Sequence, residues 1–215
     1  MLQNAMIRRF MEISFLAALV GWGPSVRADD FAGTTQRIPM RFTPKLSASV
    51  PMNLVFQNEE GHPVELGKLF QQKPVILNLV YFNCPMMCTE VLNGLVQSMK
   101  KMTLQLGRDY NVITLSIDVR EKPPLAKTKK KLYSDRYQRA GTDSGWSFLT
   151  GEAAAIQSLA DAVGFQYRYY ADIDQYDHAL GIMILTPEGQ VSRYFYGDRY
   201  DPKELRSALM EASRR

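Results

Sequence analysis

Two cysteines four positions apart are the residues of this chain whose types and spacing most directly indicate chemistry. Cys84 and Cys88 are the only cysteines among the 215 residues. Residues four apart lie on the same face of a helix, so both sulfur atoms can point at one small object. Thiolates are soft ligands that suit Cu(I) or Zn²⁺. The pair therefore predicts a metal site, a redox couple or a structural disulfide.

Two thiolates are too few for a stable metal site, so a third ligand must come from elsewhere. The chain has two histidines. His62 falls in a predicted turn and is interpreted as an exposed turn residue. His178 ends a predicted polar loop, residues 172–178, directly before a predicted strand at residues 179–186. If that strand lies beside the strand that precedes the cysteines, His178 can approach both sulfur atoms. Two thiolates and one imidazole suit Cu(I), whereas structural Zn²⁺ nearly always takes four ligands.

The sequence around the cysteines predicts the elements that position them. Residues 75–83 form an apolar run rich in branched side chains, which is typical of a buried strand. The residues after Cys88 carry apolar side chains at helical spacing. The cysteines therefore lie where a central strand gives way to a helix, and ligands of open sheet proteins collect at such carboxyl ends of strands.

Strands and helices alternate along the rest of the chain. A hairpin at residues 52–66 precedes the central strand. Further strands are predicted at 111–118, 146–150, 165–170, 179–186 and 190–196, and further helices at 123–139, 152–163 and 202–212. This order indicates an α/β fold with helices on both faces of a mixed sheet. We predict a thioredoxin-like mixed sheet with flanking helices and an extra N-terminal β-hairpin.

The first 28 residues have the layout of a secretory signal peptide. Arg8 and Arg9 form a basic start, residues 13–22 are an apolar run, and Val26-Arg27-Ala28 is a small-x-small cleavage site. An uncleaved membrane anchor is the alternative, although a membrane span needs about 20 apolar residues. Either way the protein is expected in the periplasm or another exported location, with anchoring to the inner membrane left open. Thiols tend to oxidise in that compartment.

Two parts are predicted after this leader. Residues 29–51 are expected to form an extended arm, and residues 52–215 a thioredoxin-like domain. The formal net charge of +4 falls to about +2 without the leader, which carries three arginines and one glutamate. Charge of this size gives no support for nucleic acid binding.

Five segments in order resemble the Sco/SenC family, thioredoxin-fold copper chaperones for cytochrome c oxidase assembly. The likeness runs from about Asn53 to the C-terminus. The segments are Tyr81-Phe-Asn-Cys-Pro-Met-Met-Cys-Thr-Glu-Val-Leu, Leu115-Ser-Ile-Asp-Val-Arg-Glu, Phe148-Leu-Thr-Gly151, Tyr176-Asp-His-Ala and Leu185-Thr-Pro-Glu-Gly189. Carried over position by position, the family's metal ligands are Cys84, Cys88 and His178.

The resemblance implies a copper ion as the cofactor and a function in copper delivery. The implied partner is the copper-site subunit of cytochrome c oxidase or another copper protein. Enzymatic activity is left open, because the redox pair Cys84 and Cys88 could instead serve a periplasmic thiol–disulfide oxidoreductase that keeps a partner's copper-ligand cysteines reduced. Asp177 is expected to orient the imidazole or its loop, and Asp118 to support the site or cap a helix.

Several positions depart from the family pattern. Thr89 replaces a common proline, Ala179 replaces a frequent serine, and Met86 and Met87 are unusual between the cysteines, where they could ligate the metal or contact a partner. These changes leave the three implied ligands intact. They leave open which partner is served and whether copper delivery or thiol reduction dominates. Ordinary thioredoxins have two residues between their cysteines and a cis-proline before the hairpin strand, and neither feature is present. Tyr81 stands where peroxiredoxins have threonine. A binding module with incidental cysteines is the remaining alternative.

Overall fold

A fully buried central strand, β3 (Val75–Val80), organises the fold. The computed structural model describes residues 40–84 and 87–214, without the side chains of residues 87 and 88. β3 pairs in parallel with β4 (Asn111–Ser116) and antiparallel with β8 (Gly181–Leu185). Its unbroken apolar sequence fits this position, because a strand covered on both faces has no solvent-facing side.

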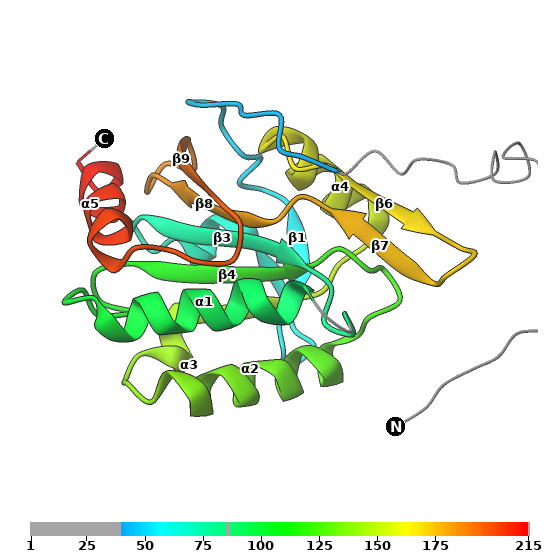
Figure 1. Ribbon diagram of the computed structural model, residues 1–215, viewed down its shortest axis with the longest axis horizontal. Helices are drawn as coiled ribbons and strands as arrows, with labels where there is room; N and C mark the ends of the chain where they lie inside the picture. The colour runs from blue at the N-terminus through cyan, green and yellow to red at the C-terminus, as the bar shows by residue number, and fades with distance from the viewer. Residues whose placement is uncertain (1–39, 85–86, 215) are drawn as a thin grey trace, which may run out of the picture. The chain divides into compact units, whose positions relative to one another are not determined.

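The main sheet has five strands in the order β5-β4-β3-β8-β9, with β5 at Trp146–Leu149 and β9 at Val191–Tyr196 (Figure 1). Because β8 runs antiparallel to β3, the carboxyl end of β3 and the amino end of β8 lie at the same edge of the sheet. The sheet order satisfies the condition on which the approach of His178 to the cysteines depends. The predicted mixed sheet is confirmed.

Helices cover both faces of this sheet, as Figure 1 shows, with α1 and α2 on one side and α4 on the other. Their bounds are α1 Met87–Lys101, α2 Pro123–Tyr137, α3 Thr142–Gly145, α4 Ala153–Ala162 and α5 Pro202–Ala212, with a 3₁₀ turn, η2, at Leu66–Leu69. The buried stripe of α1 includes Leu92, Leu95 and Met99. Gly94 lets the segment before α5 approach α1, because a Cβ there would lie 1.7 Å from the Asp198 carbonyl oxygen.

Two small hairpins lie outside the main sheet. The predicted N-terminal hairpin is present as β1 (Val55–Gln57) and β2 (Pro63–Glu65). The second joins β6 (Tyr167–Tyr170) to β7 (Gln175–His178). The loop predicted at residues 172–178 is therefore wrong in its second half. β7 has a polar sequence, and rings across the hairpin pack against it, with the centroids of Tyr169 and Tyr176 5.0 Å apart.

Part of the predicted arm packs on the domain. Phe42 forms a bridge to Phe165, Ser49 forms one to Gln190, and Val50 is buried. The predicted leader, residues 1–28, and the arm up to residue 39 lie outside the described residues. Among the helices that are described, none has the length and apolar character needed to cross a bilayer.

Candidate metal centre

Cys84 lies just beyond the carboxyl end of β3, in residues 81–84, which we call the cysteine loop. The Cys84 N–H donates a hydrogen bond to the Tyr81 carbonyl oxygen, with 3.3 Å between nitrogen and oxygen, and Cys84 is half-buried. Phe82 anchors this loop in the core, with its ring centroid 6.0 Å from that of Phe148. Cys88 belongs to the first turn of α1, and its side chain lies outside the described set. The predicted passage from a central strand through the cysteines to a helix is confirmed.

His178 is the last residue of β7, in the β6–β7 hairpin, residues 167–178, which we call the histidine hairpin. Only 7% of the residue is exposed. Nδ1 lies 2.9 Å from the Ala179 carbonyl oxygen. A carbonyl oxygen can only accept a hydrogen bond, so Nδ1 carries a proton, and in the neutral ring the lone pair is on Nε2. This is the tautomer that a metal-ligating histidine held by a backbone carbonyl adopts.

Tyr81 joins the two parts. Its ring centroid lies 5.9 Å from the His178 ring in an edge-to-face arrangement, while its carbonyl oxygen holds the Cys84 N–H. Phe165 stacks on His178 at 5.8 Å. Within the residues whose side chains are described, no three His, Cys, Asp or Glu side chains form a metal-binding group. Cys88 falls outside that set, so the three-ligand assignment stays a prediction.

A buried carboxylate that the sequence analysis missed holds the cysteine loop. Glu121 is 5% exposed and lies in the connection between β4 and α2. Its two oxygens accept the N–H groups of Phe82 at 2.7 Å and of Asn83 at 2.8 Å. The Ser116 hydroxyl donates to the same carboxylate at 2.5 Å. The only sequence signal is an acidic residue just after a buried strand, which does not reveal amide partners almost forty positions away.

Its neighbour Arg120 connects the same segment to the histidine hairpin. The guanidinium donates to Asp118 through Nε at 2.9 Å and Nη2 at 2.7 Å, and to Asp174 through Nη1 at 2.6 Å. It also lies 4.9 Å from the Tyr169 ring centroid. Asp118 therefore supports Arg120, whereas the N-cap of α2 is Lys122. The alternative that Asp118 caps a helix is wrong.

These contacts set the charge state of the carboxylates. Burial raises the pKa of Asp118, but the hydrogen bonds and positive charge of Arg120 outweigh burial and hold that pKa below its usual value. The hydrogen bond from Tyr169 and that from Arg120 lower the pKa of Asp174. Burial, followed by the negative charge of Asp118, raises the pKa of Tyr176 to about 12. Arg120 thus bridges two ionised carboxylates.

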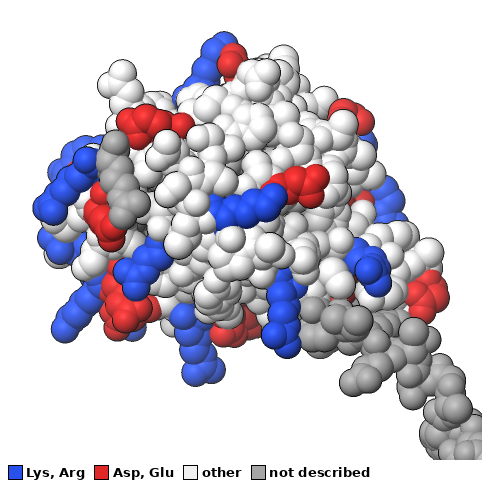
Figure 2. Space-filling view, turned by 90° about the horizontal axis from the view of Figure 1, so that it is seen from above, with Lys and Arg blue, Asp and Glu red and all other residues white. Residues whose placement is uncertain are grey.

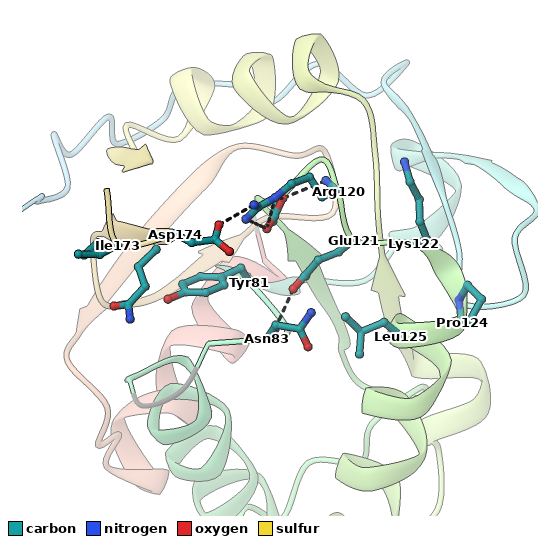
Figure 3. A pocket seen from close by; sticks show the side chains of 11 residues that line it. Tyr81, Asn83, Arg120, Glu121, Lys122, Pro124, Leu125, Ile173 and Asp174 are labelled. Atoms are coloured by element: carbon teal, nitrogen blue, oxygen red, sulfur yellow. Dashed lines mark hydrogen bonds and ion pairs between the residues drawn. The ribbon is translucent and has the colours of Figure 1, made fainter. Parts of the chain in front are cut away.

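A cavity of about 710 Å³ opens between the cysteine loop and the hairpin tip. Figure 3 shows Arg120 reaching Asp174 on one side and Glu121 meeting Asn83 on the other. The face of the molecule in Figure 2 carries basic and acidic side chains interspersed. The ion pairs of Arg120 therefore lie on one side of the cavity and the Glu121 carboxylate on the other, and Tyr81 also lines it.

The other residues singled out by sequence have separate places. His62 is exposed in the β1–β2 turn, where its N–H donates to the Asn58 side chain at 2.9 Å. Asp177 lies on β7 opposite Arg168. Met86 lies outside the described residues and Met87 is described without its side chain. In the basic run of α2, Lys127 pairs with Glu60, and Lys130 pairs with Glu59.

Comparisons with known proteins agree with this architecture. The family described as SCO1/SenC matches residues 45–213. A protein of Aquifex aeolicus VF5 for which electron transfer has been suggested is 25% identical, with a TM-score of 0.68 over 78% of this chain and 94% of that one. No curated protein sequence matches the chain significantly.

Two further structures share the fold. Arabidopsis thaliana ScoI, solved with copper bound, is 21% identical, with a TM-score of 0.60 over 78% of this chain and 98% of that one. BsSco, a member of the Sco family of cytochrome c oxidase assembly proteins in which a disulfide switch was identified, is 22% identical, with a TM-score of 0.60 over 81% and 98%. With its family match over most of the sequence and its thioredoxin-like fold, the chain belongs to the SCO1/SenC family.

Proposed function

We propose that this protein binds a copper ion through the thiolates of Cys84 and Cys88 and the imidazole of His178, and passes it to a copper protein during assembly. The observation that carries the proposal is the convergence of Cys84 and His178 on Tyr81 at one edge of the sheet. Copper bound to the family member from Arabidopsis supports the choice of metal.

The donor set fits Cu(I) as cargo. Soft thiolates favour Cu(I), and the hydrogen bond from Nδ1 to Ala179 leaves the Nε2 lone pair for the metal. Three ligands leave a coordination position through which a partner's ligand can enter and take the ion. Because the cysteines must lose their protons and the imidazole must be neutral, binding is expected to weaken as the pH falls.

Oxidation would switch this site off. When Cys84 and Cys88 form a disulfide, two thiols lose two electrons and two protons, and no thiolate remains to hold copper. If the oxidant is a partner's disulfide, that disulfide becomes two thiols, which is the alternative function of a thiol–disulfide oxidoreductase. The disulfide switch of BsSco supports considering this second function.

The partner we propose is the copper-site subunit of cytochrome c oxidase, on the strength of the assembly role described for BsSco. We also propose that the chain acts outside the cytoplasm, after export by residues 1–28 or anchored by them. Fusion of the full chain to a reporter that is active only in the periplasm tests this location. Reporter activity that disappears when residues 1–28 are deleted is the expected result.

Competition for Cu(I) with a chromophoric chelator tests the ligand set. The variants are Cys84→Ser, Cys88→Ser and His178→Ala, with His62→Ala as the matched histidine control. Each ligand variant should lose more affinity than the roughly 10- to 100-fold caused by changing groups that only support a ligand. His62→Ala should bind as the wild type does. Full affinity in His178→Ala would remove that residue from the site.

Reduction of insulin disulfides separates the two functions. A copper chaperone should reduce insulin slowly and bind one copper ion per chain when its thiols are reduced. Rapid insulin reduction that is indifferent to copper would favour the oxidoreductase instead.

A further inference from the structure

We infer that Arg120 and Glu121 are positioning residues that hold the two halves of the metal centre at a fixed separation and thereby set its copper affinity. The inference rests on the proposed copper function. Both residues lie in the connection between β4 and α2. Glu121 contacts the cysteine loop and Arg120 contacts the histidine hairpin. One short segment of chain thus holds elements that are far apart in the sequence.

The contacts of Glu121, which we call the Glu121 arm, fix the backbone that leads into Cys84. Two consecutive amides, those of Phe82 and Asn83, donate to the two oxygens of one buried carboxylate. Hydrogen bonds to an ionised acceptor are stronger than neutral ones, and Ser116 holds the carboxylate from the end of β4. Asn83 is itself exposed, so burial of its side chain does not fix the loop. The carboxylate therefore fixes the position of the backbone directly before Cys84.

The Arg120 arm fixes the hairpin tip. Asp118, which is buried, accepts from the Arg120 backbone N–H at 2.9 Å and from its guanidinium, so the arginine is seated on the end of β4. The remaining edge of the guanidinium reaches Asp174, directly before β7. A planar fork can bond two carboxylates in this way, whereas the three N–H donors of a lysine ammonium share one nitrogen and cannot span both carboxylates in the same geometry.

Movement of the tip would reach the imidazole through a short and stiff hairpin. β7 has four residues, from Gln175 to His178, and Tyr169 pairs with Tyr176 while Tyr167 pairs with His178. The Tyr176 ring also packs on Tyr81, with centroids 5.4 Å apart. The two arms frame the cavity of about 710 Å³ that Figure 3 shows between them. A shift in either arm should therefore change the distance between the sulfur atoms and the imidazole.

The test compares Glu121→Gln on one arm with Arg120→Lys and Asp174→Asn on the other. Lys122→Gln is the matched control, because Lys122 lines the same cavity but its Nζ bonds only the Val119 carbonyl among the contacts described. Three quantities are measured on the full chain: Cu(I) affinity, amide hydrogen exchange at Phe82 and Asn83, and the NMR shift of the His178 ring. His62 is an internal reference in the same spectrum.

Each arm should give its own signature. Glu121→Gln is expected to weaken Cu(I) binding about tenfold or more and to speed exchange at Phe82 and Asn83, with little change at the His178 ring. Arg120→Lys and Asp174→Asn are expected to shift the His178 ring and to weaken binding about threefold to tenfold, with the two amides unchanged. Because these two variants break the same contact, the double variant should lose no more than the larger single effect.

Circular dichroism checks that each variant is folded. If Glu121→Gln fails to fold, Glu121→Asp replaces it, because it keeps the charge but is one methylene too short to hold both amides. Copper affinities within twofold of the wild type in folded variants of both arms would overturn the inference. Unchanged amide exchange and an unchanged His178 ring would also overturn it, even if the wild type binds no copper. Failure of the wild type to bind copper would overturn the proposed function and the link to affinity, while the NMR data would still decide whether the two arms hold their elements.

Discussion

The cysteine loop and the histidine hairpin reach the candidate metal centre in physically different ways. The cysteine loop extends directly from the buried strand β3, and Phe82 and a buried carboxylate hold it. The histidine hairpin lies outside the main sheet, and its tip is held by an ion pair in which the Asp174 side chain is 69% exposed. The cysteine loop is thus fixed by burial, whereas the hairpin is buried at His178 and is held at its tip by exposed contacts.

This difference indicates that the tip of the histidine hairpin should be displaced more easily than the cysteine loop. Exposed ion pairs contribute little because water and salt screen them, whereas losing a buried hydrogen bond leaves an unsatisfied polar group. A metal that must enter and leave benefits from one ligand that can move while the others stay. The proposed site therefore combines a firmly held backbone before Cys84 with a hairpin tip that is easier to displace.

The largest expected effect comes from truncating the aromatic anchor of the cysteine loop. Phe82 is 3% exposed and packs against Phe148. Phe82→Ala should lower the free energy of unfolding by about 3–5 kcal/mol, since it leaves a cavity in the core. Urea unfolding followed by circular dichroism measures this, with Leu46→Ala as an exposed control that should change stability by less than about 0.5 kcal/mol. A loss below 1 kcal/mol would mean that burial does not anchor this half.

The matching truncation on the histidine hairpin should cost much less. Tyr169 is 40% exposed and contributes its contacts with Arg120, Tyr176 and Asp174. Tyr169→Ala should lower the free energy of unfolding by about 1 kcal/mol, because cation–π and aromatic pairs at exposed sites are weak. The same urea experiment compares the two truncations directly. Equal losses in Phe82→Ala and Tyr169→Ala would remove the distinction between the halves.

Lowering the pH should reduce the contribution of Arg120 to the free energy of unfolding. The pKa values of Asp118 and Asp174 lie below their usual range. A lowered carboxylate pKa stabilises the fold above the unfolded value, about 3.9, and that stability is lost as the pH falls through the folded value. Arg120→Ala should therefore have a lower free energy of unfolding than the wild type at neutral pH. This difference in the free energy of unfolding between the wild type and Arg120→Ala should become smaller below about pH 4. Urea unfolding at pH 7 and pH 3.5 measures both differences, and a constant difference would show that the arginine acts through packing.

A rise in salt concentration is expected to give the smallest difference between the cysteine loop and the histidine hairpin. At 1 M ionic strength the screening length is about 3 Å, so the exposed contact between Arg120 and Asp174 weakens. Amide exchange on β6 and β7 should quicken by a few-fold between low and high salt, while exchange at Phe82 and Asn83 stays constant. Exchange followed by NMR at both salt concentrations compares the two sets of amides in one sample. An equal increase in the exchange rates of both sets of amides would contradict the proposed difference between the cysteine loop and the histidine hairpin.

The sequence predicted those parts of the molecule that follow from local patterns. The unbroken apolar run of β3 and the helical spacing after Cys88 placed the cysteines at a strand-to-helix transition, and the structure confirms it. The neighbouring position of β8, on which the approach of His178 to the cysteines depends, is also observed.

The misses have physical causes. β7 was predicted as a loop because Gln175-Tyr-Asp-His178 is polar and its partner strand stabilises it through rings rather than core burial. Glu121 was missed because its partners are backbone amides of distant residues, and backbone groups leave no trace in side-chain patterns. The place of Cys88 around the metal stays a prediction.

The antiparallel pairing of β8 with β3 joins two segments that are synthesised at different times. The sulfur of Cys84 emerges from synthesis ninety-four residues ahead of the His178 ring, which at about 5–20 residues per second is a delay of several seconds or more. Until β8 docks beside β3, the segment that carries His178 is not held near the end of β3 that leads to Cys84. If the proposed ligand set is right, a chain truncated before β8 would hold copper weakly, so retention of copper would report that the segment with His178 and β8 has folded.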